Sequence, residues 1–107
     1  MEKMQPQILL AQVKQAVHEI EPDAEIILYG SRARGDAQPD SDWDLLILVD
    51  GVARWEQEEK ISHCLFQLEL EWNEVLLPIV RGRQEWNSPR YRATPFYQSV
   101  SREGVRL

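Results

Sequence analysis

The chain has 107 residues, of which 43% are hydrophobic and 28% charged, and its formal net charge is -6. This length gives room for one modest core, so we expect a single domain over residues 1–107. The negative charge argues against general nucleic-acid binding, which needs a basic face. The one cysteine, Cys64, excludes an internal disulfide.

The sequence also bears on the location of the protein. No hydrophobic run approaches the roughly 20 residues that span a bilayer. Met1 to Pro6 lack a signal-peptide pattern, so we expect no membrane partner and a cytoplasmic location.

The first half of the chain predicts one helix and two strands. Hydrophobic residues at helical spacing predict a helix from Pro6 to Ile20, with the proline in its first turn. Residues 24–29 predict a strand, after which a short helical turn ends near Gly35. A polar loop leads to a second strand over residues 42–49. Its four consecutive hydrophobic residues, 45–48, indicate burial on both faces.

The second half predicts a long helix over residues 54–72 and a third strand over residues 75–80. Pro78 within that strand indicates an edge position or a bulge. The pattern then weakens into a loop with a helical turn near residues 84–87. A Thr-Pro pair at 94–95 predicts a last helix, which a glycine at 104 ends. We therefore expect an α/β (α+β) fold, in which helices flank one side of a small mixed sheet and the second strand is central.

Two carboxylates stand at the start of the second strand. Asp42 and Asp44 are two residues apart, so in an extended strand they project from the same face. A pair of like charges in one place favours a bound cation. Mg²⁺ suits the arrangement, because it takes few carboxylates and is often completed by substrate phosphates.

A Gly-Ser turn precedes these carboxylates by about ten residues. Gly30 lets a ligand approach the backbone closely, while the Ser31 hydroxyl and free N–H groups can face phosphate oxygens. Arg32 and Arg34 add positive charge at the same turn. The residues thus predict a nucleoside triphosphate at the turn, with Mg²⁺ between it and the carboxylates.

The run GSRARGDAQPDSDWDLLIL, from Gly30 to Leu48, resembles the DNA-polymerase-β-like nucleotidyltransferase superfamily. Within it, the chain is most similar to the minimal nucleotidyltransferases, stand-alone domains often paired with a HEPN partner. The resemblance implies transfer of a nucleoside monophosphate from a triphosphate to a hydroxyl, with two divalent ions. It implies that Asp42 and Asp44 are the catalytic metal ligands, and that Gly30 and Ser31 bind the nucleotide; Arg34 joins them by its charge.

One carboxylate of the family pattern is missing. The family usually places a third acid on the strand after the next helix, and here residues 75–80 contain none. Glu74, just before that strand, is the nearest candidate, while Glu69 and Glu71 fit solvated helix positions better. Two functions therefore stay open. One is an Mg²⁺-dependent, ATP-binding nucleotidyltransferase, and the other is a catalytically weak, antitoxin-like nucleotide-binding module that pairs with a HEPN-type partner.

Charge is distributed unevenly along the chain. Residues 36–74 carry eleven acids and two basic residues, whereas residues 75–107 carry six arginines and two glutamates. These arginines are either scattered solvated charges or a surface that faces nucleotide phosphates or an acidic partner.

Overall fold

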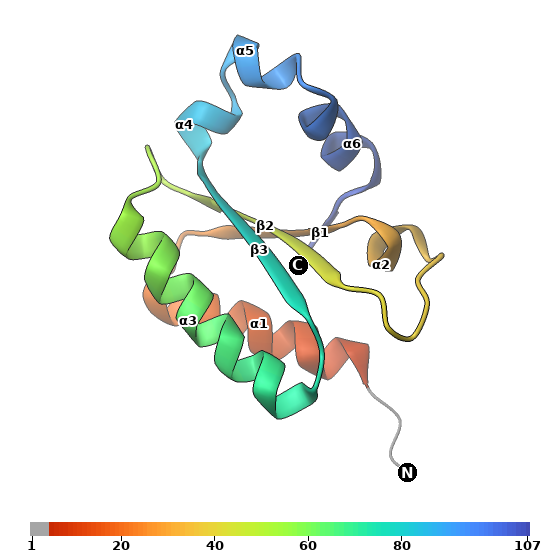
Figure 1. Cartoon of the computed structure of the whole chain (residues 1–107). Coiled ribbons are helices and arrows are strands. Elements are labelled where there is room, and N and C mark those ends of the chain that lie inside the picture. Colours follow the sequence, from red (N-terminus) through yellow and green to blue (C-terminus); the bar gives the residue numbers. More distant parts are fainter. Residues whose placement is uncertain (1–4) are drawn as a thin grey trace.

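The structure is a computed structural model that describes residues 5–107; residues 1–4, part of the segment without a signal-peptide pattern, lie outside it. A four-stranded sheet lies between two groups of helices (Figure 1). In chain order the elements are α1 (Pro6–Ile20), β1 (Glu25–Tyr29), α2 (Ser31–Arg34), β2 (Trp43–Val49), α3 (Trp55–Trp72), β3 (Leu76–Gly82), α4 (Arg83–Trp86), α5 (Pro89–Arg92), α6 (Pro95–Glu103) and β4 (Val105–Arg106).

The sheet is mixed, as predicted, and its strand order is β3-β2-β1-β4. Strand β1 runs antiparallel to β2 and β4, whereas β2 runs parallel to β3. The central position predicted for β2 and the edge position predicted from Pro78 are both confirmed. The Val75 carbonyl accepts a hydrogen bond from the Trp43 N–H at 2.9 Å. Because backbone groups alternate in direction along a strand, Pro78 turns its nitrogen away from β2, where no ladder bond is lost.

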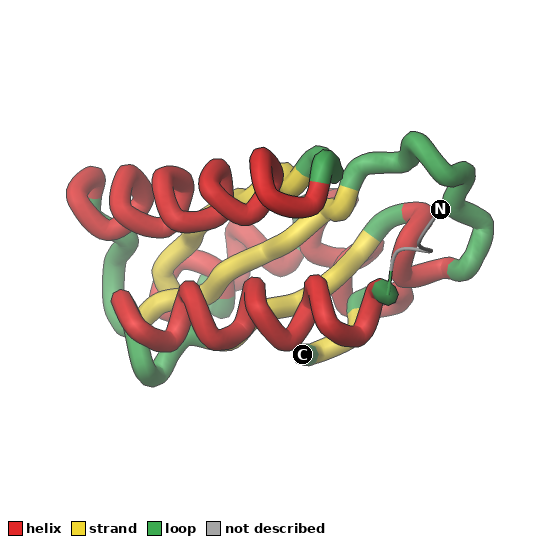
Figure 2. Tube along the Cα trace, turned by 90° about the horizontal axis from the view of Figure 1, so that it is seen from below, coloured by secondary structure: helices red, strands yellow, loops and turns green. Residues whose placement is uncertain are grey.

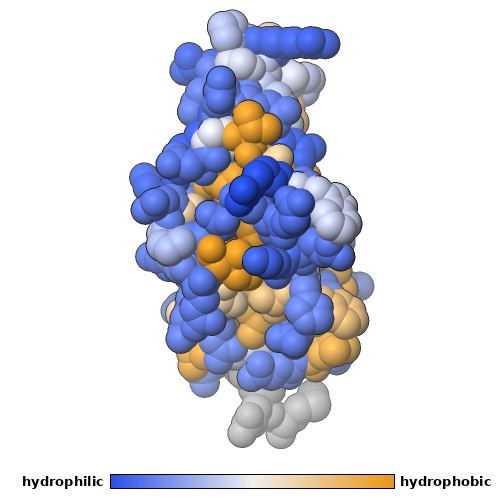
Figure 3. Space-filling view, turned by 90° about the vertical axis from the view of Figure 1, so that its left-hand side faces the viewer, coloured by the Kyte–Doolittle hydropathy of each residue, from blue (hydrophilic) through white to orange (hydrophobic). Residues whose placement is uncertain are grey.

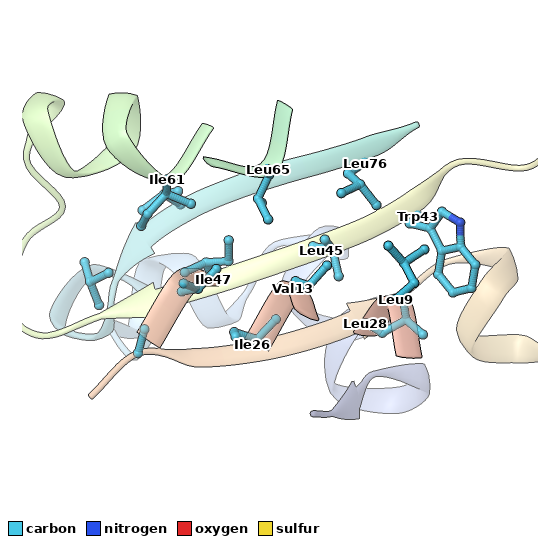
Figure 4. Close-up of a cluster of buried hydrophobic side chains, with 14 residues drawn as sticks. Leu9, Val13, Ile26, Leu28, Trp43, Leu45, Ile47, Ile61, Leu65 and Leu76 are labelled. Atoms are coloured by element: carbon cyan, nitrogen blue, oxygen red, sulfur yellow. The ribbon is translucent and has the colours of Figure 1, made fainter. Parts of the chain in front are cut away.

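Helices α1 and α3 lie side by side on one face of the sheet (Figure 2). Alternate residues of β2 point into this layer and are buried against the hydrophobic stripes of both helices. Burying a side chain of this size stabilises the fold by about 1.5–3 kcal/mol. Figure 4 shows this core, whose labelled members are Leu9, Val13, Ile26, Leu28, Trp43, Leu45, Ile47, Ile61, Leu65 and Leu76.

A second group of helices, α4 to α6, covers part of the opposite face (Figure 1). Leu46 and Leu48 of β2 are buried there against Trp86 and Val100. The Trp86 ring centroid lies 5.6 Å from that of Phe96, with the rings nearly perpendicular. The expectation of helices on one side only was wrong. The chain beyond residue 81 lacks a helical period because its helices are short and bury irregularly spaced aromatic side chains.

Two short elements were not predicted. Helix α5 begins after Ser88, whose hydroxyl accepts a hydrogen bond from the Tyr91 N–H, in a cap of the same kind as Thr94 forms for α6. Strand β4 consists of two residues and pairs with Ile27 and Leu28 of β1. Elements of this length depend on tertiary contacts rather than on periodicity, so they leave little trace in the sequence.

Among residues 5–107, no helix combines the length and the hydrophobicity that crossing a bilayer requires. The surface shown in Figure 3 is mostly hydrophilic, with hydrophobic side chains gathered in small separate areas.

Strand β2 is buried along most of its length on both faces, in agreement with the prediction from its hydrophobic run.

Candidate active site

The two aspartates lie at the beginning of β2, on the face that carries α4 to α6. Trp43 points into the α1 and α3 layer, so Asp44 points the other way. In the sheet, Asp44 is flanked by Tyr29 of β1 and Leu77 of β3. Asp42 is exposed and precedes the first residue of the strand by one position. The structure therefore brings the two predicted carboxylates together at one end of the central strand.

The electrostatics of this pair favour a cation. Burial raises the pKa of the Asp44 carboxyl, and the neighbouring Asp42 carboxylate raises it further, whereas Arg34 lowers it. In the described part of the chain, no hydrogen bond reaches a side-chain oxygen of either aspartate. Burial also raises the pKa of Tyr29 to about 12, so its hydroxyl stays protonated beside Asp44. Two unpaired, mutually repelling carboxylates are a suitable donor set for Mg²⁺.

Gly30 brings the turn close to the Asp44 carboxylate. Its φ of 76° and ψ of -159° are accessible almost only to glycine. A Cβ placed on Gly30 would lie 2.3 Å from Oδ2 of Asp44, which is far inside van der Waals contact. The missing side chain is thus required both by the backbone and by the approach of Asp44. Ser31 follows as the first residue of α2.

Arg34, at the end of α2, is the arginine that faces the site. Its guanidinium donates to Asp36 Oδ2 through Nε at 3.2 Å and to both carboxylate oxygens of Glu103 through Nη1, at 3.3 and 3.2 Å. The side chain is 46% exposed. The Arg34 guanidinium lowers the pKa of Asp44, so its positive charge acts on that carboxylate.

Arg32 and Glu74 lie elsewhere. Glu74 accepts a hydrogen bond from Trp43 Nε1 at 2.8 Å and pairs with Arg32 Nη2 at 3.5 Å. The Arg32 guanidinium stacks on the Trp43 ring at 4.3 Å and also donates to the Ser41 carbonyl. Because Trp43 points to the face opposite Asp44, Glu74 stabilises the start of β2 and is not brought to the aspartates. Arg32 likewise fixes the loop before β2 rather than facing a ligand.

Leu77 occupies the strand position beside Asp44 where a third carboxylate would be expected. It is 43% exposed. Among residues 5–107, no group of three His, Cys, Asp or Glu side chains is arranged to hold a metal ion. Glu69, one of the two helical glutamates, accepts a hydrogen bond from the Leu76 N–H at 2.7 Å and thereby caps the start of β3.

Glu103, the last residue of α6, was not anticipated from the sequence. Its Oε1 accepts a hydrogen bond from the Gly30 N–H at 3.3 Å, in addition to its contacts with Arg34. The Asp44 carboxylate also lies next to Gly30, and the negative charge of Glu103 contributes to the raised pKa of Asp44. A contact across 73 residues leaves no local pattern, because the packing of α6 on the sheet and the pairing of β4 with β1 bring Glu103 to the turn.

A cavity of about 540 Å³ lies away from this site. It is formed by residues of α1 and α3, which cover the face opposite Asp44, so it is not part of the carboxylate site. Its lining consists of Ile20, Glu56, Glu59, Lys60, His63 and Cys64.

A mixed sheet with an Asp-x-Asp pair beside a Gly-Ser turn defines the class of nucleotidyltransferase domains. The sequence signature described as "Nucleotidyltransferase domain" matches residues 10–88, and the chain belongs to this family. This match supports the predicted resemblance to the minimal nucleotidyltransferases.

Two further comparisons agree with this assignment. A Methanocaldococcus jannaschii protein, whose name proposes protein adenylyltransferase activity, is 36% identical over 55 residues. The match covers 51% of this chain and 56% of that protein, so it spans little more than half of each. A solved structure of a toxin-antitoxin complex with AMP-PNP contains a chain of similar fold, with a TM-score of 0.63 and 16% identity. That likeness covers 90% of this chain and 69% of the other.

Proposed function

We propose that this chain is an Mg²⁺-dependent nucleotidyltransferase that moves a nucleoside monophosphate from a nucleoside triphosphate to a hydroxyl. The observation that carries the proposal is the pair of neighbouring carboxylates, Asp42 and Asp44, of which Asp44 closely approaches Gly30. Family membership supports nucleotidyl transfer as the chemistry. The relative named for protein adenylylation favours ATP as the donor and a protein hydroxyl as the acceptor.

Each residue of the site has a distinct part in this chemistry. Asp42 and Asp44 would hold Mg²⁺, which supplies positive charge to the phosphate oxygens when bound. Gly30 leaves room for a phosphate next to the backbone, and Arg34 adds a planar cation that can contact two oxygens. In the transfer, the acceptor hydroxyl gives up its proton to solvent and its oxygen forms a bond to the α-phosphorus, while the bond from that phosphorus to pyrophosphate breaks. The residues of the site mainly bind and orient, which is how phosphoryl-transfer enzymes obtain most of their rate.

A second candidate is a catalytically weak module that pairs with a HEPN-type partner. Leu77 lies beside Asp44 in place of the acid that the family pattern usually provides, and this favours the second candidate. The likeness in fold to a chain of a toxin-antitoxin complex is consistent with it. Both candidates share nucleotide binding at the aspartates and differ in turnover.

Calorimetry with Mg²⁺ and AMP-PNP tests the shared part. The wild-type chain should bind only when Mg²⁺ is present, and Asp42→Asn and Asp44→Asn should each lose most of that affinity. Asp40→Asn is the matched control, since Asp40 is an exposed aspartate of the same loop. Equal affinity of all four proteins would contradict the proposal. Label transfer from α-labelled ATP to a candidate partner then separates an enzyme from a binding module.

A further inference from the structure

The Glu103 carboxylate accepts hydrogen bonds from the Gly30 N–H and from Arg34, both of which lie where the proposed function places a phosphate. One oxygen accepts from the Gly30 N–H at 3.3 Å, and both oxygens accept from Arg34 Nη1 at 3.2–3.3 Å. The Glu103 side chain is 19% exposed, so the carboxylate itself is largely enclosed, whereas its partner Arg34 is half-exposed. A carboxylate and a phosphate present the same kind of oxygen acceptor to such donors.

Two other charges oppose this position of Glu103. The residue ends α6, where the partial negative charge of the helix C-terminus disfavours an anion. Asp44 is a second like charge, since Glu103 raises its pKa. The contacts with Gly30 and Arg34 must offset both. A ligand with more negative charge, accompanied by a cation at the aspartates, can therefore compete for the same donors.

The backbone around Glu103 is held firmly. A Cβ on Gly104 would lie 2.5 Å from the Val100 carbonyl oxygen and 2.7 Å from Ile27 Cγ2, so the end of α6 is pressed against β1. The Leu107 N–H then donates to the Ile26 carbonyl at 2.9 Å. Because this backbone is fixed, Glu103 can move away from Gly30 and Arg34 only by rotation of its side chain.

We propose that Glu103 is an internal competitor that occupies the phosphate position of the Gly30 turn and must rotate away before a triphosphate binds. This inference rests on the proposed function, because it assumes that the triphosphate uses the Gly30 N–H and Arg34. It assigns Glu103 a gating role and not a catalytic one. The consequence is an affinity for nucleotide that is lower than the bare turn would give.

Calorimetry with Mg²⁺ and AMP-PNP, and separately with Mg²⁺ and inorganic triphosphate, tests the gate. Glu103→Gln should tighten both ligands about three- to tenfold, because a charged, partly enclosed contact no longer has to be broken. Glu103→Ala, which empties the position entirely, should give at least the same gain. Glu85→Gln is the control, since Glu85 also pairs with an arginine but lies outside the site. In an Arg34→Ala background, the gain from Glu103→Gln should shrink.

The outcomes separate the two proposals. If wild type binds, Asp44→Asn does not, and the Glu103 variants bind no more tightly than wild type, the gate is wrong while the nucleotide site stands. If the Glu103 variants bind as wild type does but lose label transfer, Glu103 acts in catalysis and the gate is again wrong. If neither wild type nor the folded Glu103 variants bind, both proposals fall. Thermal melting of each variant confirms that it is folded.

Discussion

Replacing Gly30 by alanine should damage both the stability and the site. The backbone conformation at Gly30 costs about 1–3 kcal/mol for any residue with a Cβ. The added atom would meet Asp44 Oδ2 at 2.3 Å, and moving a packed group aside costs about 1–3 kcal/mol more. We expect Gly30→Ala to lower the free energy of unfolding by about 2–6 kcal/mol, which lowers Tm by roughly 8–24 °C for a domain of this size.

Gly35→Ala is a closely matched control. Gly35 has a φ of 84°, but no atom lies within 4 Å of a Cβ built on it, so only the left-handed backbone, about 1–2 kcal/mol, is penalised. Urea unfolding of both variants measures the difference. Combining Gly30→Ala with Asp44→Ala removes the clashing oxygen, so the cost of Gly30→Ala should fall towards that of Gly35→Ala. Equal costs for the two glycine variants in the wild-type background would refute the close approach to Asp44.

Three other changes have expected outcomes. Burial and Asp42 raise the pKa of folded Asp44 above its ordinary value of 3.8, so the folded state favours the protonated carboxyl. This contribution to stability is fully present below pH 3.8 and is lost as the pH rises through the pKa of the folded protein. Asp44→Asn should therefore raise Tm at pH 7 without metal, by about 1–4 °C, and melting at pH 3 should show a smaller difference. Glu74→Leu leaves Trp43 Nε1 without its acceptor and should cost about 1–3 kcal/mol in urea unfolding, yet change AMP-PNP affinity less than about threefold. Thr94→Ala should cost about 1 kcal/mol of unfolding free energy, since the hydroxyl caps α6; an unchanged urea midpoint would argue against the cap.

The elements with strong local signals were predictable. The first helix follows from hydrophobic periodicity and an initial proline, and its predicted bounds agree with Pro6–Ile20. The central strand follows from its unbroken hydrophobic run. The second helical layer was missed because it is built from aromatic side chains on α4 and α6, such as Trp86 and Phe96, that touch each other without a regular spacing. Whether a sheet is covered on one face or two depends on such contacts.

The site also contains residues that could be predicted from local sequence and residues that could not. Asp42, Asp44 and Gly30 are close in sequence, and the alternation of a strand is enough to bring the carboxylates to one face. The side of the sheet that Glu74 takes was not predictable, because it depends on the hydrogen bond from the buried Trp43. The position of Glu103 depends on the packing of α6 on the sheet and on a strand pairing of two residues at the other end of the chain. Residues joined only through tertiary structure were therefore the ones that the sequence did not identify.

Pro78 has a consequence for how other molecules can reach the aspartates. An exposed strand edge normally invites another chain to add a strand, which leads to uncontrolled association. The free edge of β3 lacks a donor at Pro78, in the middle of the strand, and the opposite edge strand, β4, has only two residues. Neither edge is a good template for another strand. A molecule that approaches Asp44 is therefore recognised by the groups of the Gly30 turn and by side chains at that end of β2, and not by extension of the hydrogen-bond ladder of the sheet.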